Sequence, residues 1–211
     1  YVNKPFEYSN TITASIGMLL SYIGFIFIII IGMKYGSYWN LIWSVTYGIT
    51  LILLHTSSTF YHGVVNTNIK KKLRLMDQSC IYLLIAGTYT PIALINLYGV
   101  FGFSIFGVIW LLSILGIFLK IKDIQPFRNF EVFLYLFMGW FALIGIKELL
   151  NVMDINGIIL IFSGGLFFSI GLLFYIWKTF KYSHAIWHLF YISGCICHYL
   201  TIIGYAIPYK T

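Results

Sequence analysis

Charged residues are scarce in this chain, because Asp, Glu, Lys and Arg together make up only 9% of its 211 residues. Ordinary soluble domains are about a quarter charged and under half apolar, whereas this chain is 60% hydrophobic and 20% aromatic. So few charges cannot keep that much apolar surface dispersed in water. The composition therefore excludes a soluble single-domain enzyme and predicts an integral membrane protein. It also argues against intrinsic disorder, which requires high charge and low hydrophobicity.

Cysteine is scarce too, with three residues that all lie inside apolar stretches, namely Cys80, Cys195 and Cys197. The odd count and the lack of a C-x-x-C motif argue against both a disulfide framework and a thiolate metal site. Two residues apart on a helix, Cys195 and Cys197 point about 200° away from each other and cannot easily grip one ion. We interpret all three as small buried hydrophobic side chains.

Long apolar runs are abundant, and a stretch of about 20 apolar residues is enough to cross a bilayer as a helix. Seven such runs are found, over residues 11–33, 38–62, 77–97, 100–121, 130–149, 157–178 and 184–207. Ten-residue segments of alternating polarity, the pattern of a transmembrane β-barrel, are not seen. We therefore predict an all-α fold, a polytopic membrane protein in which residues 1–211 form a single seven-helix transmembrane domain.

The lysines and arginines fall mainly on one side of the predicted spans. Ten of them flank one set of span ends and three flank the other, where the larger set is Lys4, Lys70, Lys71, Lys72, Arg74, Lys120, Lys122, Arg128, Lys178 and Lys181. Positive residues near helix ends stay in the cytoplasm. This predicts a cytoplasmic N-terminus and loops 63–76, 122–129 and 179–183, with the C-terminus outside. The net charge of +7 then indicates contact with an anionic leaflet, not with nucleic acid.

Five histidines lie in or at the ends of the predicted spans, where ionisable side chains are costly and mark functional sites. They are His55, His62, His184, His188 and His198. In the predicted topology Ser58 and His62 lie at the end of the second span. Asp77 lies at the start of the third span, and His184 and His188 lie at the start of the seventh. All of these residues should therefore meet at one membrane depth, near the cytoplasmic surface.

The spacing of these residues is typical of a metal site. His184 and His188, four residues apart, share one helix face, and His62 would add a third nitrogen while leaving a fourth position open, as in catalytic zinc sites. Asp77 would hold the metal through a water or accept a proton from that water as general base, and Ser58 faces the same way as His62. The alternative is that these histidines only hydrogen-bond between helices.

Other ionisable residues in the spans have simpler interpretations. His55 and His198 lie about 10 Å and about 15 Å deeper than the cluster, too far for the same ion. We expect them to line a wet cavity or to bond to each other across helices. Glu7, Glu131 and Glu148 lie at span edges, and we expect them to face lipid headgroups.

Three segments together resemble a known family. They are Ser58-Thr59-Phe60-Tyr61-His62, the stretch from Asp77 to Pro91 with Ala86-Gly87-Thr88-Tyr89-Thr90-Pro91, and His184-Ala185-Ile186-Trp187-His188. The chain is similar over its whole length to the haemolysin III branch of the progestin and adipoQ receptor family. The resemblance implies a zinc held by His62, His184 and His188, with Asp77 holding a metal-bound water. Ala14 and Gln78 stand where this branch often has histidine.

The resemblance leaves three functions open. Likeness to adiponectin receptors and alkaline ceramidases implies a zinc-dependent hydrolase of a lipid amide or ester such as ceramide, with Asp77 as base and Ser58 orienting the water or the oxyanion. The family name implies a membrane-lytic pore, although the spans offer no charged lining for one. The third is a seven-helix receptor with structural zinc. Membrane lipids are the expected partners in each case.

Overall fold

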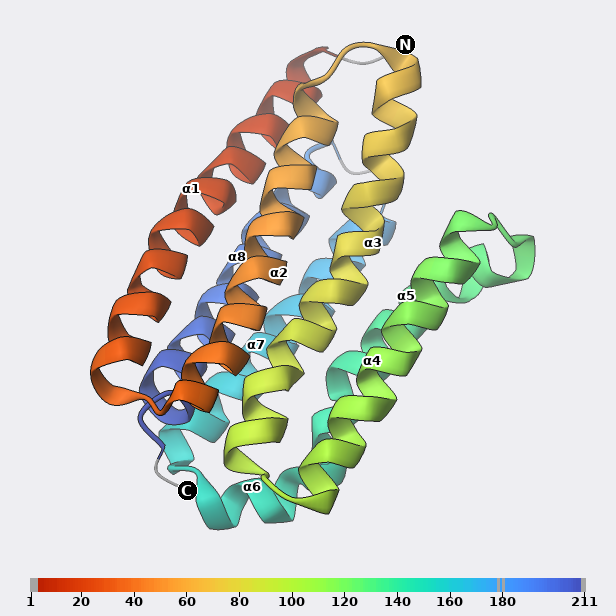
Figure 1. The fold of residues 1–211 in the computed structure, drawn as a ribbon. Helices are drawn as coiled ribbons and strands as arrows, with labels where there is room; N and C mark the ends of the chain where they lie inside the picture. Colours follow the sequence, from red (N-terminus) through yellow and green to blue (C-terminus); the bar gives the residue numbers. More distant parts are fainter. Residues whose placement is uncertain (1–3, 178, 180, 210–211) are drawn as a thin grey trace.

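The computed structural model describes residues 4–177, 179 and 181–209, and these fold into helices joined by short connections (Figure 1). The part of the chain that it describes contains no strand. The elements in chain order are α1 (Lys4–Tyr35), α2 (Tyr38–Gly63), α3 (Thr67–Pro91), η1 (Ile92–Asn96), α4 (Val100–Ile121), α5 (Gln125–Gly139), η2 (Trp140–Gly145), α6 (Ile146–Val152), α7 (Ile155–Ile176), α8 (Ser183–Thr201) and η3 (Ile202–Ala206).

Seven helical segments are long and apolar enough to cross a membrane, which confirms the predicted all-α, seven-helix class. Three of them join consecutive elements: α3 with η1, the end of α5 with η2 and α6, and α8 with η3. The segments run side by side along the length of the bundle, and α1 begins at one end while η3 ends at the other (Figure 1). The chain is therefore an integral, multi-pass membrane protein.

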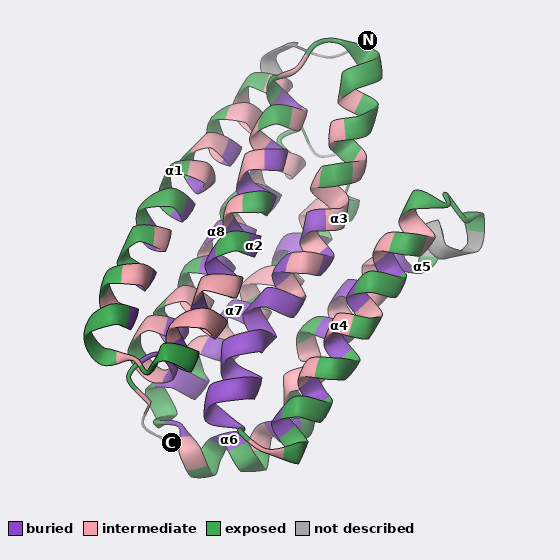
Figure 2. Ribbon diagram, viewed as in Figure 1, coloured by how far each residue is buried: buried purple, intermediate pink, exposed green. Residues whose placement is uncertain are grey.

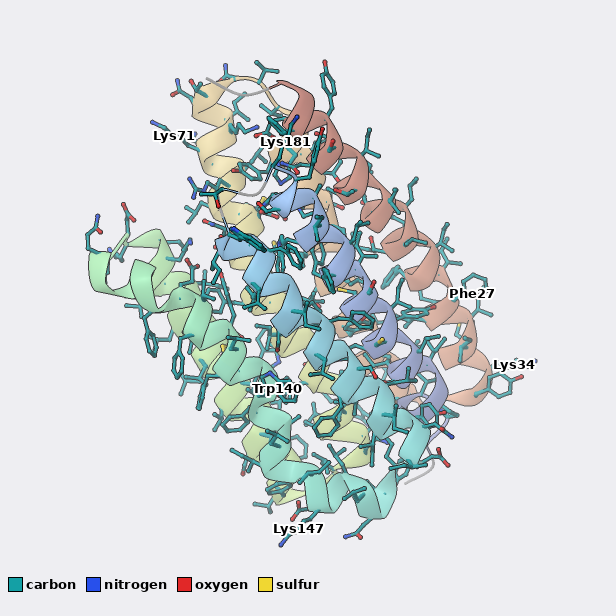
Figure 3. All side chains as sticks on the ribbon, turned by 180° about the vertical axis from the view of Figure 1, so that it is seen from behind. Phe27, Lys34, Lys71, Trp140, Lys147 and Lys181 are labelled. Atoms are coloured by element: carbon teal, nitrogen blue, oxygen red, sulfur yellow. The ribbon has the colours of Figure 1, made fainter. Side chains whose placement is uncertain are left out.

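The outer surface of the bundle is apolar, as lipid tails require. Large side chains on α1, such as Leu19 and Phe27, are about half exposed or more, and Figure 3 shows Phe27 pointing away from the other helices. The half of α3 that leads into η1 is the most continuously buried stretch (Figure 2). α3 thus forms the centre of the bundle, with α2 on one side and α4 on the other.

Helix α3 begins ten residues before the predicted span. The Asn66 side chain caps it by accepting hydrogen bonds from the backbone N–H groups of Asn68 and Ile69. Residues 67–76, predicted to be loop, are therefore helical and project the lysine-rich segment beyond the apolar core. A hydropathy scan misses this because it detects only the apolar run, whereas the helix continues beyond that run to the Asn66 cap.

The basic residues separate between the two ends of the bundle. Figure 3 shows Lys71 and Lys181 at one end and Lys34 and Lys147 at the other, the grouping on which the predicted topology depends. The assignment of the first end to the cytoplasm stays a prediction from the positive-inside rule.

Packing of α1 against both α2 and α8 positions the site, because those two helices carry the clustered histidines. Gly17 of α1 makes one of these contacts possible: a Cβ there would overlap the His55 ring of α2. A glycine at this point therefore lets the two helix backbones approach closely, as is common between membrane helices.

Gly102 of α4 packs directly on the backbone of η1, and Gly102→Ala will destabilise the protein. A methyl group there would overlap the carbonyl oxygens of Ala93 and Leu97, and a backbone carbonyl cannot rotate away as a side chain does. We expect a loss of about 1–3 kcal/mol from overpacking, measured by thermal unfolding in detergent. Gly107→Ala is the matched control, because nothing lies within 4 Å of its Cβ position. Equal stability of the two variants would contradict the prediction.

Candidate metal centre

Three imidazole rings meet between the last turn of α2 and the first two turns of α8. The ring centres of His62, His184 and His188 lie 4.9, 5.0 and 4.7 Å apart in pairs. His62 and His188 are buried, with 5% and 1% of their surface exposed, and His184 is half-buried. The structure thus brings together the three histidines that the topology and the four-residue spacing predicted.

The positions of the ring nitrogens suit a shared metal ion. One ring nitrogen from each histidine lies within 4.8 Å of the other two, and the Nε2 atoms of His62 and His184 are 3.1 Å apart. Two nitrogens bound tetrahedrally at metal–nitrogen distances of 2.0–2.1 Å would be about 3.3 Å apart. The His62–His184 pair therefore already has the required separation. This buried group can hold a metal ion.

Glu7 of α1 contacts the cluster, which corrects the expectation that it faces lipid headgroups. Its Oε2 atom lies 3.1 Å from Nδ1 of His62 and 3.1 Å from Nζ of Lys70 on α3. The contact joins residues 55 positions apart in the sequence, so no local pattern identifies His62 as the partner of Glu7.

Thr13 of α1 is a second contact that the sequence did not reveal. Its Oγ1 atom lies 2.8 Å from Nδ1 of His188. The first turns of α1 carry several polar residues, among them Glu7, Asn10 and Thr13, before the apolar run begins. These residues were the available signal that the start of α1 contacts other polar groups.

Asp77 and Ser58 lie on the wall of the same cavity as His184 and His188. Ser58 is buried with 3% of its surface exposed, Asp77 is half-buried, and the two side chains interact across the α2–α3 contact. The predicted site residues are therefore together at one level of the bundle. Gln78, next to Asp77, donates a hydrogen bond to the Tyr175 hydroxyl of α7 at 3.1 Å.

The cavity has a volume of about 1170 Å³ and extends away from the histidines along the bundle. It is bounded by α2, α3, α4, α5, η2, α7 and α8, and runs from Lys71 and Ser183 near one end to Trp140 and His198 deeper inside. Figure 3 shows Trp140 about halfway along the bundle, far from the end that carries Lys71. The volume of the cavity slightly exceeds the usual range of roughly 300–1000 Å³ for sites that hold a drug-sized ligand.

Comparison with known proteins assigns the family. A family model described as haemolysin-III related matches residues 3–199, nearly the whole chain. The chain belongs to the haemolysin III branch of the progestin and adipoQ receptor family. It is 39% identical over 201 residues to the "Hemolysin-3 homolog" of Bacillus subtilis (strain 168), covering 95% of this chain and 94% of that protein.

Two further relatives are similar to this haemolysin III family member over most of its length. The "Hemolysin-3" of Bacillus cereus is 36% identical over 202 residues, which cover 96% of this chain and 92% of that protein. The human "Monocyte to macrophage differentiation factor" is 27% identical over 175 residues, covering 79% and 71% of the two chains. The chain therefore spans nearly the full length of its bacterial relatives.

The two remaining histidines of this haemolysin III chain hold helices together, but they do not bond to each other as expected. Nδ1 of His55 lies 3.0 Å from the Tyr191 hydroxyl of α8, and the two rings stack. Nε2 of His198 lies 3.2 Å from the Ile161 carbonyl oxygen of α7. His198 also lines the cavity, and lining a cavity was one of the two alternatives expected for it.

Glu131 likewise faces inward, in contrast to the expectation that it contacts headgroups. It is 7% exposed, its Oε1 atom accepts a 2.7 Å hydrogen bond from Nζ of Lys120, and the Tyr135 hydroxyl lies 2.7 Å from the same oxygen. This buried ion pair ties α4 to α5 beside the cavity. Glu148 is exposed at the opposite end of the bundle.

Proposed function

We propose that this protein is a zinc-dependent hydrolase of a lipid amide or ester, embedded in the membrane. The observation that carries the proposal is a group of three convergent imidazoles, two of which, from His184 and His188, line one cavity together with a carboxylate and a hydroxyl. His62, His184 and His188 would hold the ion and leave a fourth position open.

Each side chain has a defined task in this proposal. A bound zinc supplies polarisation of the acyl carbonyl and activation of water. Asp77 would take the proton from the attacking water and return it to the departing nitrogen or oxygen. Ser58 would donate a hydrogen bond to the developing oxyanion. Water adds to the acyl carbon and its bond to the amine or alcohol breaks, which yields a fatty acid and an amine or alcohol.

The cavity suggests how a lipid would lie. Polar and charged residues such as Arg74 and Asp77 line it close to the histidines, whereas the deeper lining includes Leu84, Leu136 and Phe168. An amide or ester linkage would sit at the polar level while the acyl chain extends along the apolar part. Ceramide is one lipid with this arrangement.

A test of the proposal is release of fatty acid from defined lipids. Purified protein, loaded with zinc or stripped by a chelator, is incubated with ceramides and phospholipids, and the products are identified by mass spectrometry. We expect product from the loaded protein and none after chelation. The absence of product with every lipid would contradict the proposal.

The names of the bacterial relatives favour a second candidate, a membrane-lytic function. The two candidates are separated by adding the protein to dye-filled vesicles made of a lipid that it does not hydrolyse. A pore would release the dye from these vesicles without forming any fatty-acid product. If removal of zinc only lowers the unfolding temperature and neither product nor dye appears, the ion is structural, as in a receptor.

A further inference from the structure

Two side chains of α1 contact ring nitrogens of the cluster that is proposed to hold an ion, Glu7 at Nδ1 of His62 and Thr13 at Nδ1 of His188. We propose that Glu7 and Thr13 are positioning residues that hold His62 and His188 in the tautomer whose Nε2 lone pair faces that ion. The inference rests on the metal-binding part of the proposed function and does not depend on turnover.

We assign the Thr13 hydroxyl as the acceptor in its contact with His188. Thr13 Oγ1 lies 3.0 Å from the carbonyl oxygens of both Ser9 and Asn10, and either can accept its one proton. With that proton on the α1 backbone, Nδ1 of His188 donates its own proton to Thr13 across 2.8 Å. Neutral imidazole carries one proton, which leaves Nε2 of His188 with its lone pair.

Glu7 imposes the same tautomer on His62. An ionised carboxylate is purely an acceptor, so Nδ1 of His62 donates its proton to Oε2 of Glu7 across 3.1 Å. Lys70 holds that same oxygen from α3 at 3.1 Å. A carboxylate behind a ligating histidine fixes the orientation of the ring and raises its basicity as a ligand.

The first measurement is the tautomer of each ring in the metal-free protein. The chain has only five histidines, so NMR of protein labelled with ¹⁵N-histidine gives few signals to assign. We expect Nδ1–H for both His62 and His188, before and after zinc is added. Finding Nε2–H for His62 or His188 would overturn the inference.

The second measurement is zinc affinity by competition with a chelating dye. Glu7→Ala and Thr13→Val are each expected to weaken binding by about 10- to 100-fold, the usual effect of removing such a partner. Thr13→Ser, which keeps the hydroxyl, should restore the affinity. Thr11→Val is the matched control, because Thr11 is equally half-buried and its hydroxyl donates to the Glu7 carbonyl of its own helix.

The outcomes separate this inference from the proposed function. Wild-type affinity in both Glu7→Ala and Thr13→Val would overturn the positioning role, as would an equal loss in Thr11→Val and Thr13→Val. Zinc binding that depends on Glu7 and Thr13 without any lipid hydrolysis would support the positioning role and contradict the hydrolase. A wild-type protein that binds no zinc would overturn both.

Discussion

We expect His188→Ala to reduce the zinc content of the purified protein from the proposed one ion per chain to almost none, because catalytic zinc sites have three protein ligands and this variant would keep two. His188 is the most buried of the three, with 1% of its surface exposed, and its ring is next to both His62 and His184. Two ligands and a cavity open to water cannot retain the ion. The content is measured by elemental mass spectrometry after dialysis against a weak chelator.

The matched control is His198→Gln on the same helix. His198 is a partly buried imidazole that bonds to the Ile161 carbonyl, ten residues from His188 and outside the cluster. We expect this variant to keep its zinc while the unfolding temperature falls. If His188→Ala folds with normal helical content and still holds a full equivalent of zinc, the three-histidine centre is wrong.

Asp77→Asn will abolish lipid hydrolysis while leaving zinc bound. Asparagine is similar in shape to aspartate but cannot accept a proton at neutral pH, and loss of a general base costs about 10²- to 10⁴-fold in rate. Asp77 shares the cavity wall with His184 and His188 without belonging to the three-histidine group. The turnover number and the zinc content of the same preparation are therefore measured together.

Asp154→Asn is the matched control for this substitution. Asp154 caps α7 by accepting a hydrogen bond from the backbone N–H of Asn156, and asparagine caps helices about as well as aspartate. Wild-type turnover is expected there. Turnover of Asp77→Asn close to that of wild type would remove Asp77 from the proposed chemistry, and loss of zinc in this variant would make it a determinant of metal binding.

The membrane spans and the histidine cluster were predictable because both follow from patterns along the chain. An apolar run of about 20 residues determines a membrane-crossing helix by itself, since backbone polar groups in lipid must be satisfied within the segment. Once the spans alternate in direction, residues at the same kind of helix end lie at the same depth. His62, His184 and His188 could therefore be grouped before any fold was known.

The partners of the buried charges were not predictable in the same way. Glu7 and Glu131 are both at the edges of apolar runs, and position alone suggested lipid headgroups for each. The structure instead pairs Glu7 with His62 and Lys70, and Glu131 with Lys120. Which helix lies beside which is a matter of side-chain packing, and a hydropathy pattern contains no information about the neighbour of a given face.

By itself, the amino-acid sequence determined that this chain crosses a membrane seven times and that three of its histidines gather near one end, because the span of a bilayer and the pitch of a helix are constants. Only the tertiary structure decided that α1 packs against both α2 and α8 and so brings Glu7 and Thr13 to the Nδ1 atoms of His62 and His188. The reason is physical: hydrogen bonds act over about 3 Å, and such distances between residues far apart in the sequence exist only once the helices have packed.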